Sequence, residues 1–117
     1  MVTRSTHAAV ADRRNDDVEI YINGEFFHRS EARISVFDSG FLVGDGIWEG
    51  LRLHRGHFAF LDRHLSRLFA GAAAASIDIG RRDGITAALY QTVARNQMHD
   101  DVHVRLMITR GDKKTPS

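Results

Sequence analysis

The sequence predicts a small α+β domain in which an antiparallel β-sheet is covered by two helices. Residues 18–61 are rich in alternating apolar and polar positions, the period of half-buried strands. Residues 61–97 repeat apolar side chains at helical spacing, and residues 101–111 return to a period of two. Strands joined as hairpins, with two helices on one face, are typical of the α+β class. A chain of 117 residues suffices for one such domain with a single core.

The first two strands are expected at 18–24 and 25–29. The first, VEIYING, alternates apolar and polar residues and ends in Asn23-Gly24. This dipeptide is typical of a two-residue hairpin turn, because both of its residues tolerate a positive φ. The segment EFFHR is therefore the return strand of a hairpin.

A third strand is expected at 32–38, where ARISVFD also alternates, before a glycine-rich bend. A second hairpin is expected at 46–61, with its turn near Arg55-Gly56. Its first strand should divide into two faces: Ile47, Glu49, Leu51 and Leu53 on one, and Trp48, Gly50 and Arg52 on the other.

Two helices and a last strand complete the domain. The first helix is expected at 61–77 and the second at 82–97, with a break near Gly80. The last strand is expected at 101–111. One of its faces should carry Val102, Val104, Leu106 and Ile108, and the other His103, Arg105, Met107 and Thr109.

Composition excludes several classes of function. The net charge of +1 gives no reason to expect binding to nucleic acid or to a membrane surface. The absence of cysteine excludes disulfides, thiolate catalysis and cysteine-based zinc sites. The histidines lack the spacing of a metal site with three ligands, so we predict no metal. Residues 1–17 are predicted to be a flexible lead-in without the apolar core of a signal peptide, which favours a cytoplasmic protein.

Arg67 is the first candidate for binding chemistry. It lies on the first predicted helix, one turn after Arg63 and His64. A guanidinium can donate two parallel hydrogen bonds to phosphate oxygens, so this cluster could hold a phosphate. From spacing alone, a solvated basic surface is the more common explanation.

His103 and Arg105 form a second candidate pair, because residues two apart on a strand point to the same side. A positive charge there could bind a carboxylate, or it could simply protect an edge strand from aggregation. Arg110 follows at the end of the same strand. Asp38, Asp45 and Glu49 could supply a pair of carboxylates, but they are expected to hydrogen-bond the backbone of the glycine-rich bend instead.

Four motifs, in order, resemble a known family. They are YINGEFF, EARISVFDSGFLVGDGIWEGLRL, FLDRHLSRLFAGAAA and HVRLMITRG. Together they are similar to the N-terminal small domain of class IV (fold type IV) pyridoxal-phosphate aminotransferases. That family includes the branched-chain and D-amino-acid aminotransferases, and the likeness runs over residues 18–111.

The resemblance implies roles for particular residues. Arg67 matches the arginine that binds the phosphate of pyridoxal 5'-phosphate. Val43 and Trp48 match positions in the substrate pocket, and the bend FDSGFLVGDGIWEG would form a wall of it. His103 and Arg105 match a pair that faces the substrate. Arg110 matches an arginine near the substrate carboxylate in D-amino-acid enzymes, and either arginine could bind that group.

The resemblance also implies parts that this sequence lacks. Residues 18–111 would be the small domain and residues 112–117 the start of an interdomain loop, with a larger cofactor domain beyond it. The Schiff-base lysine is expected in that domain, because Lys113 and Lys114 lie in a polar tail and an exposed lysine stays protonated.

The function implied is amino-group transfer between an amino acid or amine and a 2-oxo acid, by a homodimer. Two alternatives stay open. One is a pyridoxal-phosphate lyase that acts on aminodeoxychorismate. The other is a non-catalytic domain that binds a small molecule or a partner.

Overall fold

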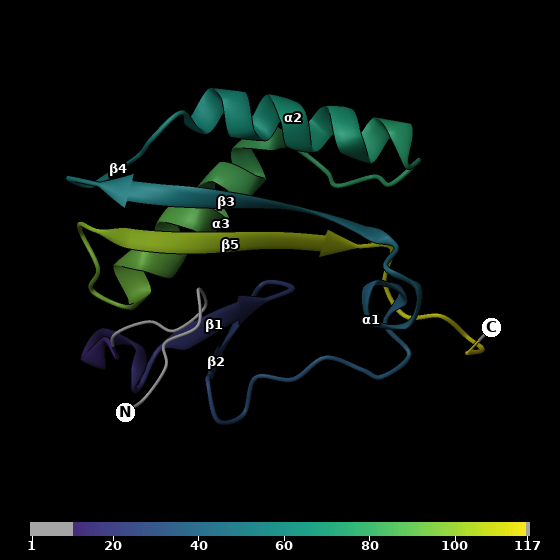
Figure 1. Ribbon diagram of the computed structural model, residues 1–117, viewed down its shortest axis with the longest axis horizontal. Coiled ribbons are helices and arrows are strands. Elements are labelled where there is room, and N and C mark those ends of the chain that lie inside the picture. The colour runs from purple at the N-terminus through teal and green to yellow at the C-terminus, as the bar shows by residue number, and fades with distance from the viewer. Residues whose placement is uncertain (1–10, 117) are drawn as a thin grey trace, which may run out of the picture.

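The computed structural model describes residues 11–116 and confirms the α+β class. Within this range the strands form one sheet of order β1-β2 and another of order β4-β3-β5 (Figure 1). In chain order the elements are a 3-10 turn at Arg13–Asn15, β1 (Glu19–Ile22), β2 (Glu25–His28), α1 (Ser39–Val43), β3 (Gly46–His54), β4 (His57–Phe58), α2 (Leu61–Ala74), α3 (Arg82–Arg95) and β5 (Val102–Thr109).

The sheet of β4, β3 and β5 is the centre of the fold. β3 and β5 run antiparallel, and their pairing is continuous from Gly46↔Thr109 to Leu53↔Val102. Within the described chain, β4 pairs with Leu53 and His54 alone, so the first part of β3 has a strand neighbour on one edge only. The turn between β3 and β4 lies at Arg55 and Gly56, as predicted, and both residues have positive φ.

The core lies on one face of this sheet, where α2 and α3 pack (Figure 1). Leu51 and Leu53 of β3 are almost completely buried there. They meet apolar side chains from both helices, among them Leu65, Leu68, Leu89 and Val93. The predicted division of β3 and β5 into two faces is confirmed, because burial alternates residue by residue along most of each strand.

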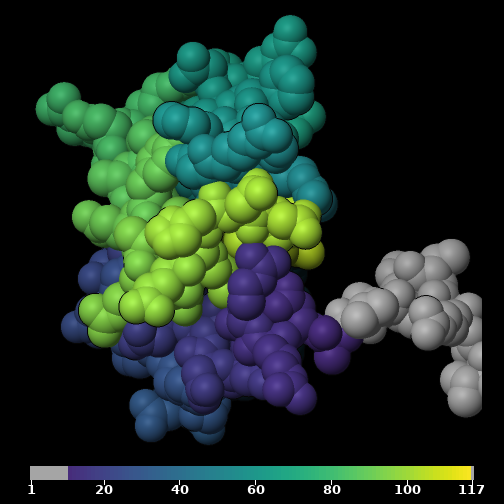
Figure 2. All heavy atoms as spheres, turned by 90° about the vertical axis from the view of Figure 1, so that its left-hand side faces the viewer, coloured from purple at the N-terminus to yellow at the C-terminus, as the bar shows by residue number. Residues whose placement is uncertain are grey.

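The hairpin of β1 and β2 forms as predicted, with Asn23 and Gly24 at positive φ in the turn. It is a separate sheet, and it lies against the end of α3. The Asn96 side chain accepts a 2.8 Å hydrogen bond from the Glu19 backbone nitrogen and donates one of 2.9 Å to the Glu19 carbonyl. Figure 2 shows these purple and blue N-terminal residues below the yellow-green residues that follow α3.

The third strand predicted at 32–38 is wrong. That segment forms no strand in the described chain: only Asp38 at its end makes an isolated bridge, with Asp112, and Ile34 and Val36 project into solvent. Asp38 instead begins α1, because its carboxylate accepts hydrogen bonds from the backbone nitrogens of Gly40 and Phe41. Alternation alone therefore does not make a strand when no neighbouring edge is available to pair with it.

The segments at the two ends of the described range contact the domain. Of the predicted lead-in, residues 1–10 lie outside the described chain. Arg14, close after them, donates hydrogen bonds to the carbonyls of Asp100 and Asp101. Beyond β5, the Lys113 nitrogen donates to the carbonyl of Phe37 near α1. No helix in the described chain has the length and apolar character needed to cross a membrane.

Candidate functional site

The face of β3 and β5 that the helices leave uncovered carries three of the predicted substrate residues, Trp48, His103 and Arg105. We call it the open face, and it comprises Trp48, Gly50, Arg52, His103, Arg105 and Met107. Two of its apolar side chains are largely exposed, Trp48 by 56% and Met107 by 59%. Exposed aromatic and methionine side chains on a rigid sheet are well suited to contact a ligand.

Trp48 and Arg105 are in direct contact across the strand pair. The Arg105 guanidinium carbon lies 4.4 Å from the centre of the Trp48 ring, within the range of a cation–π interaction. The ring thus limits the directions that the long arginine side chain can take. Arg105 stays on the open face as an oriented positive charge.

Gly50 makes room for His103 on the same face. A Cβ atom at residue 50 would lie 2.8 Å from Cε1 and 3.0 Å from Nε2 of the His103 ring. Only a residue without a side chain allows the imidazole to lie so close to β3. The structure therefore brings Trp48, His103 and Arg105 together around one glycine.

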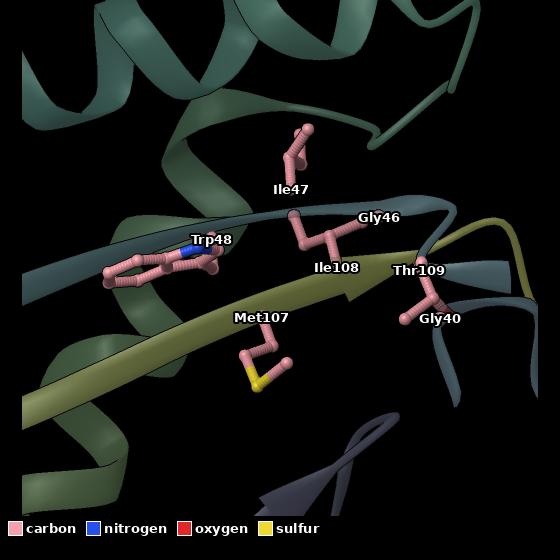
Figure 3. Close-up of a pocket in the computed structure, with 8 residues that line it drawn as sticks. Gly40, Gly46, Ile47, Trp48, Met107, Ile108 and Thr109 are labelled. Atoms are coloured by element: carbon pink, nitrogen blue, oxygen red, sulfur yellow. The ribbon is translucent and has the colours of Figure 1, made fainter. Parts of the chain in front are cut away.

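A small hollow of about 190 Å³ lies where β3 begins and β5 ends (Figure 3). Trp48 and Met107 border it, so it adjoins the open face. Its lining consists of Gly40, Gly44, Gly46, Ile47, Trp48, Met107, Ile108 and Thr109. The glycine-rich bend thus forms one wall of a pocket.

Arg67 lies on α2 and pairs with Glu49 of β3. Its Nε donates a 3.0 Å hydrogen bond to Oε2, and its Nη2 donates one of 2.7 Å to Oε1. His64, one turn earlier on α2, contributes a third contact of 2.7 Å between Nδ1 and Oε1. Because an ionised carboxylate only accepts, Nδ1 is the donor.

The two partners of this pair differ sharply in burial. The Glu49 side chain is 6% exposed, whereas that of Arg67 is 72% exposed. The hydrogen bond from Arg67 lowers the pKa of Glu49 against the opposing effect of burial, and His64 adds to the lowering. Glu49 is therefore a buried, ionised carboxylate that fixes the base of a guanidinium open to solvent.

Only two of the three basic residues in the predicted cluster, His64 and Arg67, meet at Glu49. Arg63 does not join Glu49; its guanidinium carbon lies 5.5 Å from the centre of the Phe60 ring. Arg67 is absent from the lining of the hollow, and β4 does not cover the part of β3 that carries Glu49. The Arg67 head group is accessible to solvent.

Arg110 is engaged within the domain. Its Nε donates a 2.5 Å hydrogen bond to Asp45, and its two terminal nitrogens donate to the carbonyls of Ala75 and Ser76 at the end of α2. Val43, at the end of α1, is exposed and does not line the hollow. The structure therefore separates these two candidates from the group on the open face.

The expectation for the three acidic residues of the bend is right for one of them. Asp38 binds backbone, but Asp45 and Glu49 pair with arginines instead. Sequence reasoning missed this role of Glu49 although a signal was present. Glu49 falls among the apolar side chains of its face, and a carboxylate buried there requires a cationic partner.

Known proteins resemble the chain in sequence and in fold. A sequence model described as "Amino-transferase class IV" matches residues 46–117. Branched-chain-amino-acid aminotransferase-like protein 1 of Arabidopsis thaliana is 41% identical over 96 residues, which are 81% of this chain and 17% of that one. The D-alanine aminotransferase of Bacillus licheniformis is 33% identical over 80% of this chain and 33% of its own.

Solved structures share the arrangement of elements. One is a hypothetical aminotransferase from Mycobacterium tuberculosis in its PLP-bound form, with a TM-score of 0.71 and 22% identity. The match covers 81% of this chain and 34% of that one. The chain thus spans about a third or less of the length of the proteins it resembles.

Proposed function

The chain belongs to the class IV aminotransferase family, and from this premise we propose that it forms the small domain of a pyridoxal-phosphate-dependent aminotransferase. The enzyme transfers an amino group between an amino acid or amine and a 2-oxo acid. Support comes from relatives that are named branched-chain-amino-acid aminotransferase-like protein 1 and D-alanine aminotransferase. A neighbour with the same fold is described as PLP-bound, which supports the choice of cofactor.

The observation that carries this proposal is the group of Trp48, His103 and Arg105 on the open face. Arg105 offers a fixed positive charge to a substrate carboxylate, and the Trp48 ring offers an apolar surface to the substrate side chain. His103, held over Gly50, adds a hydrogen-bonding group beside them. A site with an apolar wall and a few oriented polar groups is typical of small-molecule binding.

Between the two candidate arginines, we assign the substrate carboxylate to Arg105. The Nε and both terminal nitrogens of Arg110 already donate to Asp45 and to carbonyls at the end of α2. Rearranging Arg110 would leave those carbonyls and the Asp45 carboxylate without their partner. Arg110 then acts on the site by holding the bend against α2, and we assign the exposed Val43 side chain to a part of the substrate pocket outside the hollow.

Arg67 is assigned to the cofactor phosphate, and its geometry fits that group. Glu49 occupies the edge formed by Nε and Nη2, while Nη1 forms no hydrogen bond with any of residues 11–116. The edge between Nη1 and Nη2 is thus available to two oxygens of a phosphate. When bound, pyridoxal phosphate supplies the electron sink for chemistry at the amino-bearing carbon.

The rest of the enzyme is also part of the proposal. Ligand pockets usually enclose about 300–1,000 Å³, and the hollow here, at about 190 Å³, is smaller. We assign the remaining walls, and the lysine that attaches the cofactor, to a larger domain reached through residues 112–117. Residues 18–111 are the small domain, and the enzyme is a homodimer.

The test is an assay of the complete protein, with pyridoxal phosphate added, for amino transfer to 2-oxoglutarate or pyruvate. Branched-chain L-amino acids and D-alanine are offered as donors, and the oxo acid formed from each donor is measured. The proposal expects transfer from at least one donor. Formation of pyruvate and 4-aminobenzoate from aminodeoxychorismate, with no transfer from any donor, would show a lyase instead.

A further inference from the structure

We propose that Glu49 is a positioning residue, whose buried carboxylate orients the Arg67 guanidinium for the cofactor phosphate. This inference rests on the proposed role of Arg67 as a phosphate ligand. It concerns a residue on the opposite face of β3 from the substrate group, and one that reaches the cofactor only through another side chain.

The geometry of the pair selects which donors remain for a ligand. Glu49 accepts from Nε and Nη2 of Arg67, along the side of the guanidinium. Both Nη1 hydrogens and the second Nη2 hydrogen then point away from the carboxylate, because the guanidinium is planar and rigid. One Nη1 hydrogen and the second Nη2 hydrogen form the end of the fork, which matches two oxygens of a phosphate.

The contrast in burial indicates which partner sets the position. Glu49 lies on a strand paired residue by residue with β5, and its side chain is 6% exposed. Arg67 projects from α2 with 72% of its side chain exposed, and a free arginine of that kind samples many rotamers. His64 holds the carboxylate from a second direction. The conformational entropy of the Arg67 side chain is therefore already reduced in the folded domain. Binding of a ligand does not have to restrict it again.

Glu49 could act on the phosphate through its charge or through its positioning of Arg67. These two roles predict opposite effects of Glu49→Gln on the affinity for the cofactor. A carboxylate near a phosphate site repels the phosphate, so removing its charge alone would tighten binding. Glutamine also replaces one of the two acceptor oxygens that hold Nε and Nη2 with an NH2 group, which cannot accept, so the guanidinium is less fixed and binding weakens. The sign of the change in affinity therefore distinguishes a positioning residue from a mere counter-ion.

A second ion pair of the same geometry provides a matched control. Arg95 donates from Nε and Nη2 to Glu19 at 2.7 and 3.2 Å, also side-on. It links α3 to β1, away from the open face, and the Glu19 side chain is 31% exposed. Glu19→Gln removes an equivalent carboxylate without touching Arg67.

The experiment measures the dissociation constant of pyridoxal phosphate for the complete protein and for three variants, with folding checked by circular dichroism. Glu49→Gln should weaken binding roughly tenfold, the scale of one hydrogen bond to a charged group. Glu19→Gln should leave the constant unchanged. Unchanged or tighter binding by a folded Glu49→Gln variant would overturn the inference.

The third variant, Arg67→Ala, separates the inference from the proposal on which it rests. If Arg67→Ala also binds the cofactor normally, the assignment of Arg67 to the phosphate is wrong. If Arg67→Ala weakens binding and Glu49→Gln does not, only the positioning role is wrong.

The positioning role of Glu49 can also be tested on the unmodified protein, which serves if the Glu49→Gln variant does not fold. Hydrogen exchange of the Arg67 Nε proton is followed by NMR with and without pyridoxal phosphate. The Nε proton should exchange slowly in both states, because Glu49 keeps its hydrogen bond while the ligand takes the other edge. Rapid exchange on addition of the cofactor would mean that the phosphate displaces Glu49, and would overturn the inference.

Discussion

The two faces of the sheet formed by β3 and β5 carry side chains from the same strands, yet different forces account for them. On the covered face, Leu51 is fully buried against the helices, as hydrophobic burial requires. On the open face, Trp48 is more than half exposed and stacks on Arg105. Folding alone explains the apolar side chains of the first face. The second face exposes apolar surface without contributing to the core, which is why we assign substrate binding to it.

The largest expected effect is the loss of stability when the covered face is truncated. Leu51→Ala removes most of a side chain that is 0% exposed, which should lower the free energy of unfolding by about 2–5 kcal/mol. Met107→Ala on the open face is the control, and it should stay within about 0.5 kcal/mol. Denaturant unfolding, followed by circular dichroism, measures both. Equal losses for the two variants would show that the open face belongs to the core.

The second effect concerns the open face and should appear in catalysis instead of stability. Arg105→Ala removes a hydrogen bond to a charged group, worth about 1.5–3 kcal/mol, so KM for carboxylated donors should rise at least tenfold. Steady-state kinetics of the complete enzyme provide the measurement. A simple amine donor is the internal control, because it has no carboxylate to lose contact with. A matching rise in KM for that amine would contradict the assignment of Arg105.

Strand and helix identities could largely be predicted because they depend on local patterns. The Asn23-Gly24 turn, the alternation along β3 and β5, and the apolar stripes of α2 and α3 are each visible within a short window. The failure at 32–38 has a physical cause. Whether an alternating segment becomes a strand depends on a partner edge, and such a partner lies far away in the sequence.

The candidate site was predicted less completely, because several of its contacts also join residues that lie far apart in the sequence. Which residues share a face of one strand follows from its period, so His103 and Arg105 could be paired in advance. The contacts that use Arg110 and Glu49 join residues 65 and 18 positions apart. No local pattern specifies those partners. The general rule that a buried carboxylate needs a cationic partner applies to Glu49, but it was not used, and Glu49 was expected to bind backbone instead.

A third effect compares Gly46, the first residue of β3, with Gly50 on the open face. A Cβ at Gly46 would lie 2.8 Å from the backbone oxygen of Ile108, whereas one at Gly50 would meet the movable His103 ring at the same distance. Gly46→Ala should therefore cost about 1–3 kcal/mol of stability, the usual range for overpacking. Gly50→Ala should cost less, because the imidazole can rotate away.

The measurements for these glycines are thermal unfolding and substrate KM. Gly50→Ala should shift KM by displacing His103, even though its melting temperature stays close to that of the unmodified protein. If Gly50→Ala is as destabilising as Gly46→Ala, the imidazole is held in place by more than its contact with β3. His103 would then serve to hold the strands together, in the manner of a residue on the covered face.

The smallest effect involves Glu49, the one acidic side chain among the buried residues of β3. Its pKa in the folded protein is held below the ordinary value of 4.5 by Arg67. The unfolded chain therefore takes up the proton first as the pH falls, so the stabilising contribution is full above 4.5 and is lost through the folded pKa. The contribution is small because water screens a pair whose arginine is mostly exposed.

This dependence can be isolated by comparing the unmodified protein with Glu49→Gln across a pH series of unfolding free energies. The difference between the two curves should be constant at neutral pH and shrink as the pH falls below 4.5, because protonation of Glu49 makes its side chain neutral like that of glutamine. Glu19→Gln is an unsuitable substitute here, since Glu19 has a lowered pKa of its own from Arg95. A difference that stays constant down to the acid transition would mean that Glu49 contributes through shape alone, and the charge that we assign to the covered face would have no energetic role.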